Sequence, residues 1–278
     1  MIVVRLSSGF GNQLFQYAFA LYLQERYLDT VYLDMSWYKY RSTYRKSAID
    51  IISNLPVISD KKIYYNYKSV RYQIKKILFA LNPSVRRINE ANLSFPPNDK
   101  FLYFDGYWQT DKYVKQMMDP AAYFEPREPM PDFIRNYCDD FQKTYAISLH
   151  VRRGDFFSTD FINRFGICTP DYYERAVCRL TKDLDTFTLY VFSDDPEWVK
   201  AHIKLPSNSI FIRNEDINPY WYVSLMSKCR DNIISNSSFS WWGAYLNNNP
   251  KKKVVAPDKW LLGEKNTIAL ENWIKIQV

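Results

Sequence analysis

The chain has 278 residues, which exceeds the usual single domain and is short for two full-sized ones, so length allows one large α/β domain or two compact lobes. Its 47% hydrophobic and 24% charged residues are typical of an ordinary folded soluble protein and exclude a disordered chain. A net charge of +7 favours acidic partners such as phosphates or an anionic membrane surface, and no recognisable nucleic-acid-binding module accompanies it.

The cysteines and the N-terminus bear on compartment. The four cysteines are scattered, with neither a C-x-x-C pair nor the Cys/His spacing of a metal site, and we expect reduced, mostly buried thiols. The first residues already read as a strand, which leaves no place for a signal peptide, and no apolar run approaches the ~20 residues of a membrane span. We therefore expect a cytoplasmic protein, at most peripheral on the inner face of the membrane.

The chain opens with the pattern of a βαβ unit. Residues 2–6 form a short apolar run, which a Ser-Ser-Gly-Phe-Gly-Asn turn ends at residues 7–12. Residues 14–21 then read as a helix and residues 30–33 as a second strand. A strand, a glycine-containing turn, a helix and a strand in this order predict the start of a parallel α/β sheet.

The middle of the chain, residues 38–127, is less regular. Within it, residues 61–90 hold eight Lys or Arg against one acid, with apolar residues at roughly helical spacing. We favour a solvated helix that covers the first lobe. A basic amphipathic helix lying on anionic lipid stays open as the alternative.

The second half alternates more clearly between strands and helices. Three prolines between residues 126 and 131 precede it, and we place a lobe boundary near residues 132–144. The alternation predicts a parallel sheet. Its expected strands are residues 146–151, 187–192, 209–212, 232–235 and 254–256, with helices such as 170–182 and 196–203 between them.

Ligands of open parallel sheets bind at the carboxyl ends of the strands, so the residues that follow each strand matter most. The first strand of the second half leads into His-Val-Arg-Arg-Gly-Asp at residues 150–155. Arginine carries a rigid fork of donors that matches phosphate oxygens. We favour phosphate binding by this motif over the alternative, a structural Arg–Asp cluster that closes the loop.

Two acidic pairs flank the next strand. Asp195 precedes Pro196 and is predicted to cap a helix, whereas Asp194 lies nearer the strand and is predicted to accept hydrogen bonds from a ligand. An Asp-x-Asp at residues 183–185 precedes the strand, which is the wrong end of the sheet for a metal site, and reads as a solvated turn.

A third segment with candidate ligand-binding residues lies at residues 231–244. There a strand runs into four serines and an asparagine and then into a helix. Hydroxyls and free backbone N–H groups at a helix N-terminus bind phosphate without a metal. Ser237, Ser238, Phe239 and Ser240 are the candidates. A serine that merely caps an ordinary helix is the alternative, and it explains one serine but not four.

Three of these motifs together resemble the α-1,2-fucosyltransferases of glycosyltransferase family 11. They are Gly-Phe-Gly-Asn-Gln-Leu-Phe-Gln-Tyr-Ala at residues 9–18, the motif at residues 150–155, and Ser-Asn-Ser-Ser-Phe-Ser-Trp-Trp-Gly-Ala at residues 235–244. Asp-Gly-Tyr-Trp-Gln at residues 105–109 and Ala-Pro-Asp-Lys-Trp at residues 256–260 also fit, in family order and spacing. One departure is Ser7-Ser8, where the family usually has Gly-Gly.

The resemblance implies an α/β fold of the GT-B type, with two Rossmann-like lobes that each hold a parallel sheet. Residues 1–135 would form the acceptor-side lobe and residues 136–278 the lobe that binds GDP-fucose. It also implies an inverting reaction that needs no metal or other cofactor. The partners would be GDP-fucose and a galactose-terminated oligosaccharide or lipid-linked glycan, with no nucleic acid.

The same resemblance distributes roles among the residues. Arg152 would contact the β-phosphate of GDP and stabilise it as it departs, and Asn12 would lie near the reacting centre. The general base is not readable from the motifs, so Asp155 is the first candidate and Asp194 the second. The residues implied in substrate binding are His150 and Asp231, which would read the guanine, together with Arg153, Asp194, Ser237, Ser238, Phe239, Ser240, Gly11 and Gln13.

Two other functions stay open at this point. The chain could bind a nucleotide-sugar or glycan without turning it over, or it could be a transferase that uses another GDP-sugar. The turn at Asn12 and Gln13 favours an enzyme over a binding protein, and the residues implied in reading guanine favour a GDP-linked donor.

Overall fold

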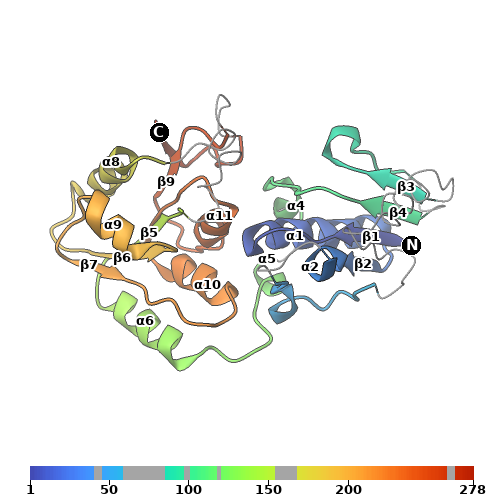
Figure 1. Cartoon of the computed structure of the whole chain (residues 1–278), viewed down its shortest axis with the longest axis horizontal. Coiled ribbons are helices and arrows are strands. Elements are labelled where there is room, and N and C mark those ends of the chain that lie inside the picture. Colours follow the sequence, from blue (N-terminus) through green and yellow to red (C-terminus); the bar gives the residue numbers. More distant parts are fainter. Residues whose placement is uncertain (41–45, 59–84, 97–100, 118–119, 154–167, 262–266) are drawn as a thin grey trace. The chain divides into compact units, whose positions relative to one another are not determined.

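The computed structural model describes residues 1–40, 46–58, 85–96, 101–117, 120–153, 168–261 and 267–278 (Figure 1). These residues form two compact units, Met1–Glu128 and Pro129–Val278. The division lies ahead of the expected boundary at residue 135, because α6 (Asp132–Gln142) is one continuous helix that packs on α10 (Tyr220–Lys228) of the second unit. None of the helices in the described ranges combines the length and apolarity that a bilayer span requires.

The first unit is a four-stranded parallel sheet in the order β2-β1-β4-β3. Its opening βαβ unit confirms the prediction, with the first helix longer than expected. Its elements are β1 (Ile2–Arg5), α1 (Phe10–Tyr27), β2 (Val31–Asp34), α2 (Ser36–Tyr40), η1 (Ile49–Ile51), β3 (Val85–Ile88), η2 (Glu90–Asn92), β4 (Phe101–Phe104), α4 (Lys112–Lys115) and α5 (Pro120–Tyr123).

The basic segment at residues 61–90 differs from its prediction where the structure describes it. Residues up to 84 lie outside the described ranges. Val85–Ile88 then forms β3, an edge strand that pairs with β4, instead of the end of a helix. The helical prediction is therefore wrong for these four residues.

The second unit is a six-stranded parallel sheet in the order β10-β9-β8-β5-β6-β7. The chain builds outward from β5 to β7 on one side and then returns to place β8 on the other side of β5. This order creates a topological switch point between β5 and β8. The elements after α6 are β5 (Ala146–Val151), α8 (Pro170–Thr181), β6 (Thr188–Ser193), α9 (Pro196–His202), β7 (Ser209–Phe211), α10, β8 (Asp231–Ile233), α11 (Ser238–Tyr245), β9 (Val254–Pro257) and β10 (Ile274–Ile276).

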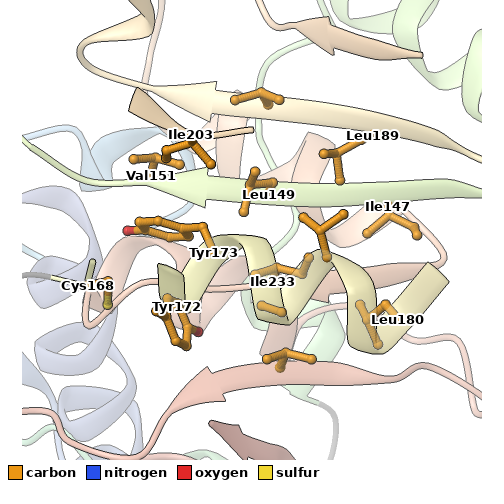
Figure 2. Packing of buried hydrophobic residues seen from close by; sticks show 14 of the residues in the cluster. Ile147, Leu149, Val151, Cys168, Tyr172, Tyr173, Leu180, Leu189, Ile203 and Ile233 are labelled. Carbon is orange, nitrogen blue, oxygen red and sulfur yellow. The ribbon is translucent and has the colours of Figure 1, made fainter. Parts of the chain in front are cut away.

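A hydrophobic core fixes the central strand of this sheet. Figure 2 shows α8 lying along β5, with Tyr173 from the start of the helix beside Val151 and Leu149, and Leu180 near its other end on the side of Ile147. All of these side chains are almost completely buried. Because β5 is covered by packed apolar groups, the residues that follow it leave the sheet from a rigid edge.

Candidate active site

The carboxyl ends of β5 and β8 are joined across the switch point by one side-chain hydrogen bond. The His150 Nδ1 atom lies 3.0 Å from Ser235 Oγ, and both residues are buried. The Phe239 ring, from the first turn of α11, lies with its centroid 5.7 Å from that of the imidazole. The structure thus brings three predicted or motif residues together at the place where nucleotide ligands of such sheets bind.

Burial keeps the imidazole of His150 neutral. Removal from water, with a smaller contribution from the positive charge of Arg152, lowers the pKa of His150 to about 4. At neutral pH the positive charge at this strand end therefore comes from the arginines that follow. The structure shows His150 joining the carboxyl end of β5 to the segment after β8, and its predicted contact with guanine stays a prediction.

Asp194, at the end of β6, holds the arginine motif in place. Its Oδ2 atom lies 2.7 Å from Nη1 of Arg152, and its Oδ1 atom accepts a hydrogen bond of 2.9 Å from the backbone N–H of Arg153. Both side chains of the Arg152–Asp194 pair are about a quarter to a third exposed. The sequence predicts Asp194 as a ligand acceptor or base, whereas in the structure both of its oxygens bind the arginine turn.

Arg153 does not share the environment of Arg152. Its guanidinium carbon lies 3.4 Å from the centre of the Trp198 ring, a cation–π contact, and its Nε lies 3.9 Å from the Asp195 carboxylate. Asp195 also accepts a 3.1 Å hydrogen bond from the Trp198 backbone, which confirms its prediction as the cap of α9. Arg153, predicted to bind substrate, is therefore anchored on α9.

The serine-rich patch forms the N-terminus of α11, as predicted. Ser237 is the cap, with its Oγ accepting from the backbone N–H of Phe239 at 3.4 Å. The Ser240 hydroxyl is buried and donates to the Ser237 carbonyl, so it is used within the helix. Ser238 and Phe239 are partly exposed at the helix end, where the helix dipole favours an anion.

Sequence reasoning missed a lysine at the other end of this helix. The Lys252 ammonium donates to the carbonyl oxygens of Ala244 at 2.7 Å and Tyr245 at 3.1 Å. It thereby satisfies carbonyls that a helix C-terminus leaves without partners. A lysine seven or eight residues beyond a helix end carries no local sequence signal for this role.

Asp231 does not reach the site. It begins β8 and pairs in register with Ile147, near the start of β5, so it lies toward the amino edge of the sheet. Its fully buried carboxylate accepts hydrogen bonds from the Tyr145 hydroxyl at 2.9 Å and the Lys253 backbone at 2.7 Å. Ser235 comes four positions later in the chain, two residues after the end of β8, which is about 13 Å at the usual rise of extended backbone. The structure gives Asp231 a structural role at this edge, and its implied contact with guanine stays a prediction.

In the first unit, two of the predicted residues at the start of α1 are buried and one is partly exposed. Gln13 is buried, its Oε1 accepts from the Ala48 backbone at 2.9 Å and its Nε2 donates to the Lys46 carbonyl at 3.2 Å. Gly11 is buried within the first turn. Asn12 is partly exposed, and its Oδ1 accepts a 2.6 Å hydrogen bond from Gln109, a residue for which sequence reasoning gave no role.

The remaining predictions concern residues away from these contacts. Asp155 lies outside the described residues. The Asp-x-Asp at residues 183–185 lies between α8 and β6, which confirms that it precedes the strand. Within the described ranges, no three acidic, His or Cys side chains gather as a set of metal ligands. His202 is exposed at the end of α9.

Two units that are each built on a parallel sheet, with arginine and a helix N-terminus at the switch point of the second, give the chain a fold of the GT-B class. The chain belongs to glycosyl transferase family 11, whose family model matches residues 1–277.

Sequence relatives agree with that family. The chain is 30% identical to the O-antigen biosynthesis glycosyltransferase WbnK of Escherichia coli, over 98% of this chain and 99% of the relative. It is also 30% identical to an alpha-1,2-colitosyltransferase of E. coli, over 100% and 99%. The mouse galactoside 2-alpha-L-fucosyltransferase Sec1 is 23% identical over 51% of this chain and 46% of that protein.

Solved structures resemble the chain in fold. The fucosyltransferase NodZ from Bradyrhizobium superposes with a TM-score of 0.52 at 14% identity, covering 87% of this chain and 91% of NodZ. A NodZ alpha-1,6-fucosyltransferase co-crystallised with GDP gives 0.51 at 15% identity, over 88% and 91%. At these identities the likeness establishes the GT-B fold.

Proposed function

We propose that this family 11 enzyme is an inverting fucosyltransferase that moves L-fucose from GDP-β-L-fucose to the 2-hydroxyl of a terminal galactose in a surface glycan. The observation that carries the proposal is Arg152, held by Asp194 at the carboxyl end of β5, beside the strand that leads into α11. The activities by which the relatives are named support the sugar chemistry: O-antigen biosynthesis, an α-1,2 linkage and a galactoside acceptor.

In the proposed reaction the oxygen of the acceptor 2-hydroxyl attacks C1 of fucose from the face opposite GDP. A new C1–O bond forms as the bond from C1 to the β-phosphate oxygen breaks, and the bonding electrons leave with GDP. Negative charge therefore develops on the phosphate. Arg152 and the N-terminus of α11 stabilise that charge, and an interaction of this kind contributes about 3 kcal/mol to the transition state.

A neutral His150 is consistent with stabilisation of the phosphate by Arg152 and the N-terminus of α11. Its hydrogen bond to Ser235 fixes the segment after β8 against the carboxyl end of β5. Since its pKa is lowered to about 4, it adds no proton of its own to the phosphate at neutral pH. In the proposed site, the positive side-chain charge for the phosphate at neutral pH is therefore that of the Arg152 guanidinium, which Asp194 orients.

Deprotonation of the acceptor hydroxyl belongs to a carboxylate in the same proposal. Asp194 already accepts hydrogen bonds through both oxygens, from Arg152 and Arg153. Asp155, the other acid of the motif, stays the proposed base. The proposed reaction needs no metal, because the cationic groups of the chain take the place of one at the leaving phosphate.

A second donor is favoured by one of the relatives. The alpha-1,2-colitosyltransferase shares 30% identity over the whole chain, and colitose is fucose without its 3-hydroxyl. A site that hydrogen-bonds the 3-hydroxyl rejects the deoxy sugar strongly, whereas an apolar pocket discriminates weakly. Comparison of the two donors therefore reports how the pocket contacts C3.

The test is incubation of the purified chain with GDP-fucose or GDP-colitose and a panel of galactose-terminated acceptors. We expect GDP release coupled to a product whose new linkage is α-1,2 by NMR. Preference for GDP-colitose would replace the donor and keep the reaction. Tight GDP binding without turnover of either donor would contradict the enzyme and support the binding-protein alternative.

A further inference from the structure

The first unit has its own switch point. Strand β1 lies between β2 and β4, and the chain passes first to β2 on one side and later to β4 on the other. The crevice outside the carboxyl ends of two such strands is where open α/β sheets bind ligands. In this unit, residues that follow β1 and β4 meet across that edge.

The meeting is made by two amides. Gln109, after β4, donates through Nε2 to Oδ1 of Asn12, in the first turn of α1, at 2.6 Å. Both side chains are partly exposed. Within the described residues the structure gives Gln109 Oε1 and Asn12 Nδ2 no protein partner. The pair therefore offers an acceptor and donors from fixed positions to a ligand outside the sheet.

The turn before Gln109 is built to expose an aromatic ring. Gln16 donates to the Gly106 carbonyl at 2.9 Å, and the Glu90 carboxylate accepts from the Trp108 backbone at 2.7 Å. Trp108 adopts a left-handed backbone, φ 56°, which is unfavourable for a residue with a Cβ atom. Its ring is 2% exposed and stacks on Phe19 at 4.1 Å, whereas the neighbouring Tyr107 is left 46% exposed.

Glycine is required inside this turn. A Cβ atom on Gly106 would lie 2.9 Å from the Trp108 ring and 3.0 Å from the Glu90 side chain. The turn therefore keeps one shape, with Trp108 inward and Tyr107 outward. An unfavourable backbone held by this many contacts is characteristic of a functional position.

Two arginines beside this turn pair with its carboxylate. Arg5 lies 3.0 Å from the Asp105 carboxylate, and Arg87 pairs with the same carboxylate. The second unit, in contrast, presents Arg152 and a helix N-terminus. The first unit thus offers amides and an aromatic face in place of cations, which matches a neutral polyhydroxyl ligand. Sugar hydroxyls both donate and accept hydrogen bonds, and the C–H face of a pyranose packs on aromatic rings.

We propose that Tyr107, Gln109 and Asn12 form the binding subsite for the acceptor sugar, with the Tyr107 ring as the stacking platform for a neutral hexose. This inference rests on the proposed function, which supplies a sugar as acceptor. Of the three residues, Tyr107 determines affinity through its ring, and the two amides select hydroxyl orientation.

The experiment compares acceptor and donor kinetics in variants of Tyr107 and Gln109. Tyr107→Ala is expected to raise the acceptor KM tenfold or more, and Tyr107→Phe to stay within twofold of the unchanged protein, because the ring is retained. Gln109→Leu is expected to raise the acceptor KM similarly. The donor KM should not change in any of these variants. The slow hydrolysis of the GDP-sugar by water, which releases GDP in the absence of acceptor, should not change either. Leu28→Ala, at a residue 92% exposed in the same unit, is the matched control.

Two results would overturn the subsite. Acceptor KM values unchanged in Tyr107→Ala and Gln109→Leu would remove it, and equal losses in Tyr107→Ala and Tyr107→Phe would show that the ring is not a platform. If the unchanged protein turns over no GDP-sugar, the proposed function fails separately. Saturation-transfer NMR with a methyl β-galactoside then tests the subsite directly, since signal in the unchanged protein and its loss in Tyr107→Ala supports it, and equal signal or none contradicts it.

Discussion

At the scale of single residues, two adjacent arginines have different neighbours and therefore different expected roles. Arg152 pairs with Asp194, whereas Arg153 rests on the Trp198 ring. We expect Arg152→Ala to lower kcat about a hundredfold or more, equivalent to about 3 kcal/mol, and to weaken GDP binding less. Arg152→Lys should not rescue it, because an ammonium lacks the guanidinium fork. Steady-state kinetics beside calorimetric GDP binding measures both, and near-normal kcat in a folded Arg152→Ala protein would refute the phosphate role.

Asp194 is expected to act through Arg152. Asp194→Asn removes the charge that orients the guanidinium, so we expect kcat to fall about tenfold or more, the range of a lost charge-assisted hydrogen bond. In the Arg152→Ala background the same change should have no further effect, because coupled residues are not additive. Asp195→Asn is the matched control, since asparagine still caps α9. Full additivity of Asp194→Asn with Arg152→Ala would rule out positioning.

His150 makes stability depend on pH. Its folded pKa of about 4 lies below the ordinary value near 6.5, so the folded state binds the proton less readily than the unfolded state. The free energy of unfolding therefore holds its full value, as far as His150 is concerned, above about pH 6.5 and falls as the pH drops toward 4. The loss amounts to roughly 2 kcal/mol between pH 7 and 5. Urea unfolding at the two pH values measures it. The chain has two histidines, so His150→Gln should abolish the difference and His202→Gln, at an exposed residue, should retain it.

At the scale of elements, α11 is anchored at both ends. Ser237 caps its N-terminus, and the Lys252 ammonium binds the carbonyls of Ala244 and Tyr245 at its C-terminus. Lys252→Met leaves those carbonyls without the charged donor, and we expect a loss of about 2 kcal/mol in the free energy of unfolding. The exposed neighbour Lys251→Met is the control and should change it little. Chemical denaturation curves decide, and equal effects of the two variants would contradict the anchoring role.

The elements also show how far sequence could carry the fold. Strands such as β5 and β6 were predictable because parallel strands buried on both faces read as continuous apolar runs. Strand β3, Val-Arg-Arg-Ile, carries two charges because it lies at a sheet edge, and its sequence resembles the basic segment before it. Edge strands lack the apolar signal, so their positions follow from pairing and not from composition.

For the site, local motifs located Arg152 and Ser237 but could not give their contacts. The resemblance implied that Asp231 reads the guanine, whereas β8 starts at Asp231 and runs from there toward Ser235. Gln109 was overlooked because its partner Asn12 lies 97 residues earlier. Pairings over such distances depend on strand order, which local patterns do not determine.

At the scale of the whole molecule, the expected chemistry makes activity independent of divalent metal. The charge at the leaving phosphate comes from Arg152 and the helix N-terminus in the proposed mechanism, so we expect turnover of the donor to survive excess EDTA. The assay follows GDP release before and after chelation. Complete loss of activity that only Mn²⁺ or Mg²⁺ restores would require a metal at the phosphate and would overturn this part of the mechanism.

The hydrogen bond between His150 and Ser235 has a consequence for the folding of the second unit as well as for the proposed reaction. Its partners are 85 residues apart, because β6, β7 and their helices lie between β5 and β8 in the chain. Closing so long a loop is slow, because the chain loses entropy before the contact repays it. We therefore expect the pairing of β5 with β8 to form slowly, and in the proposed mechanism a second unit without this pairing carries the motifs but not the assembled phosphate site.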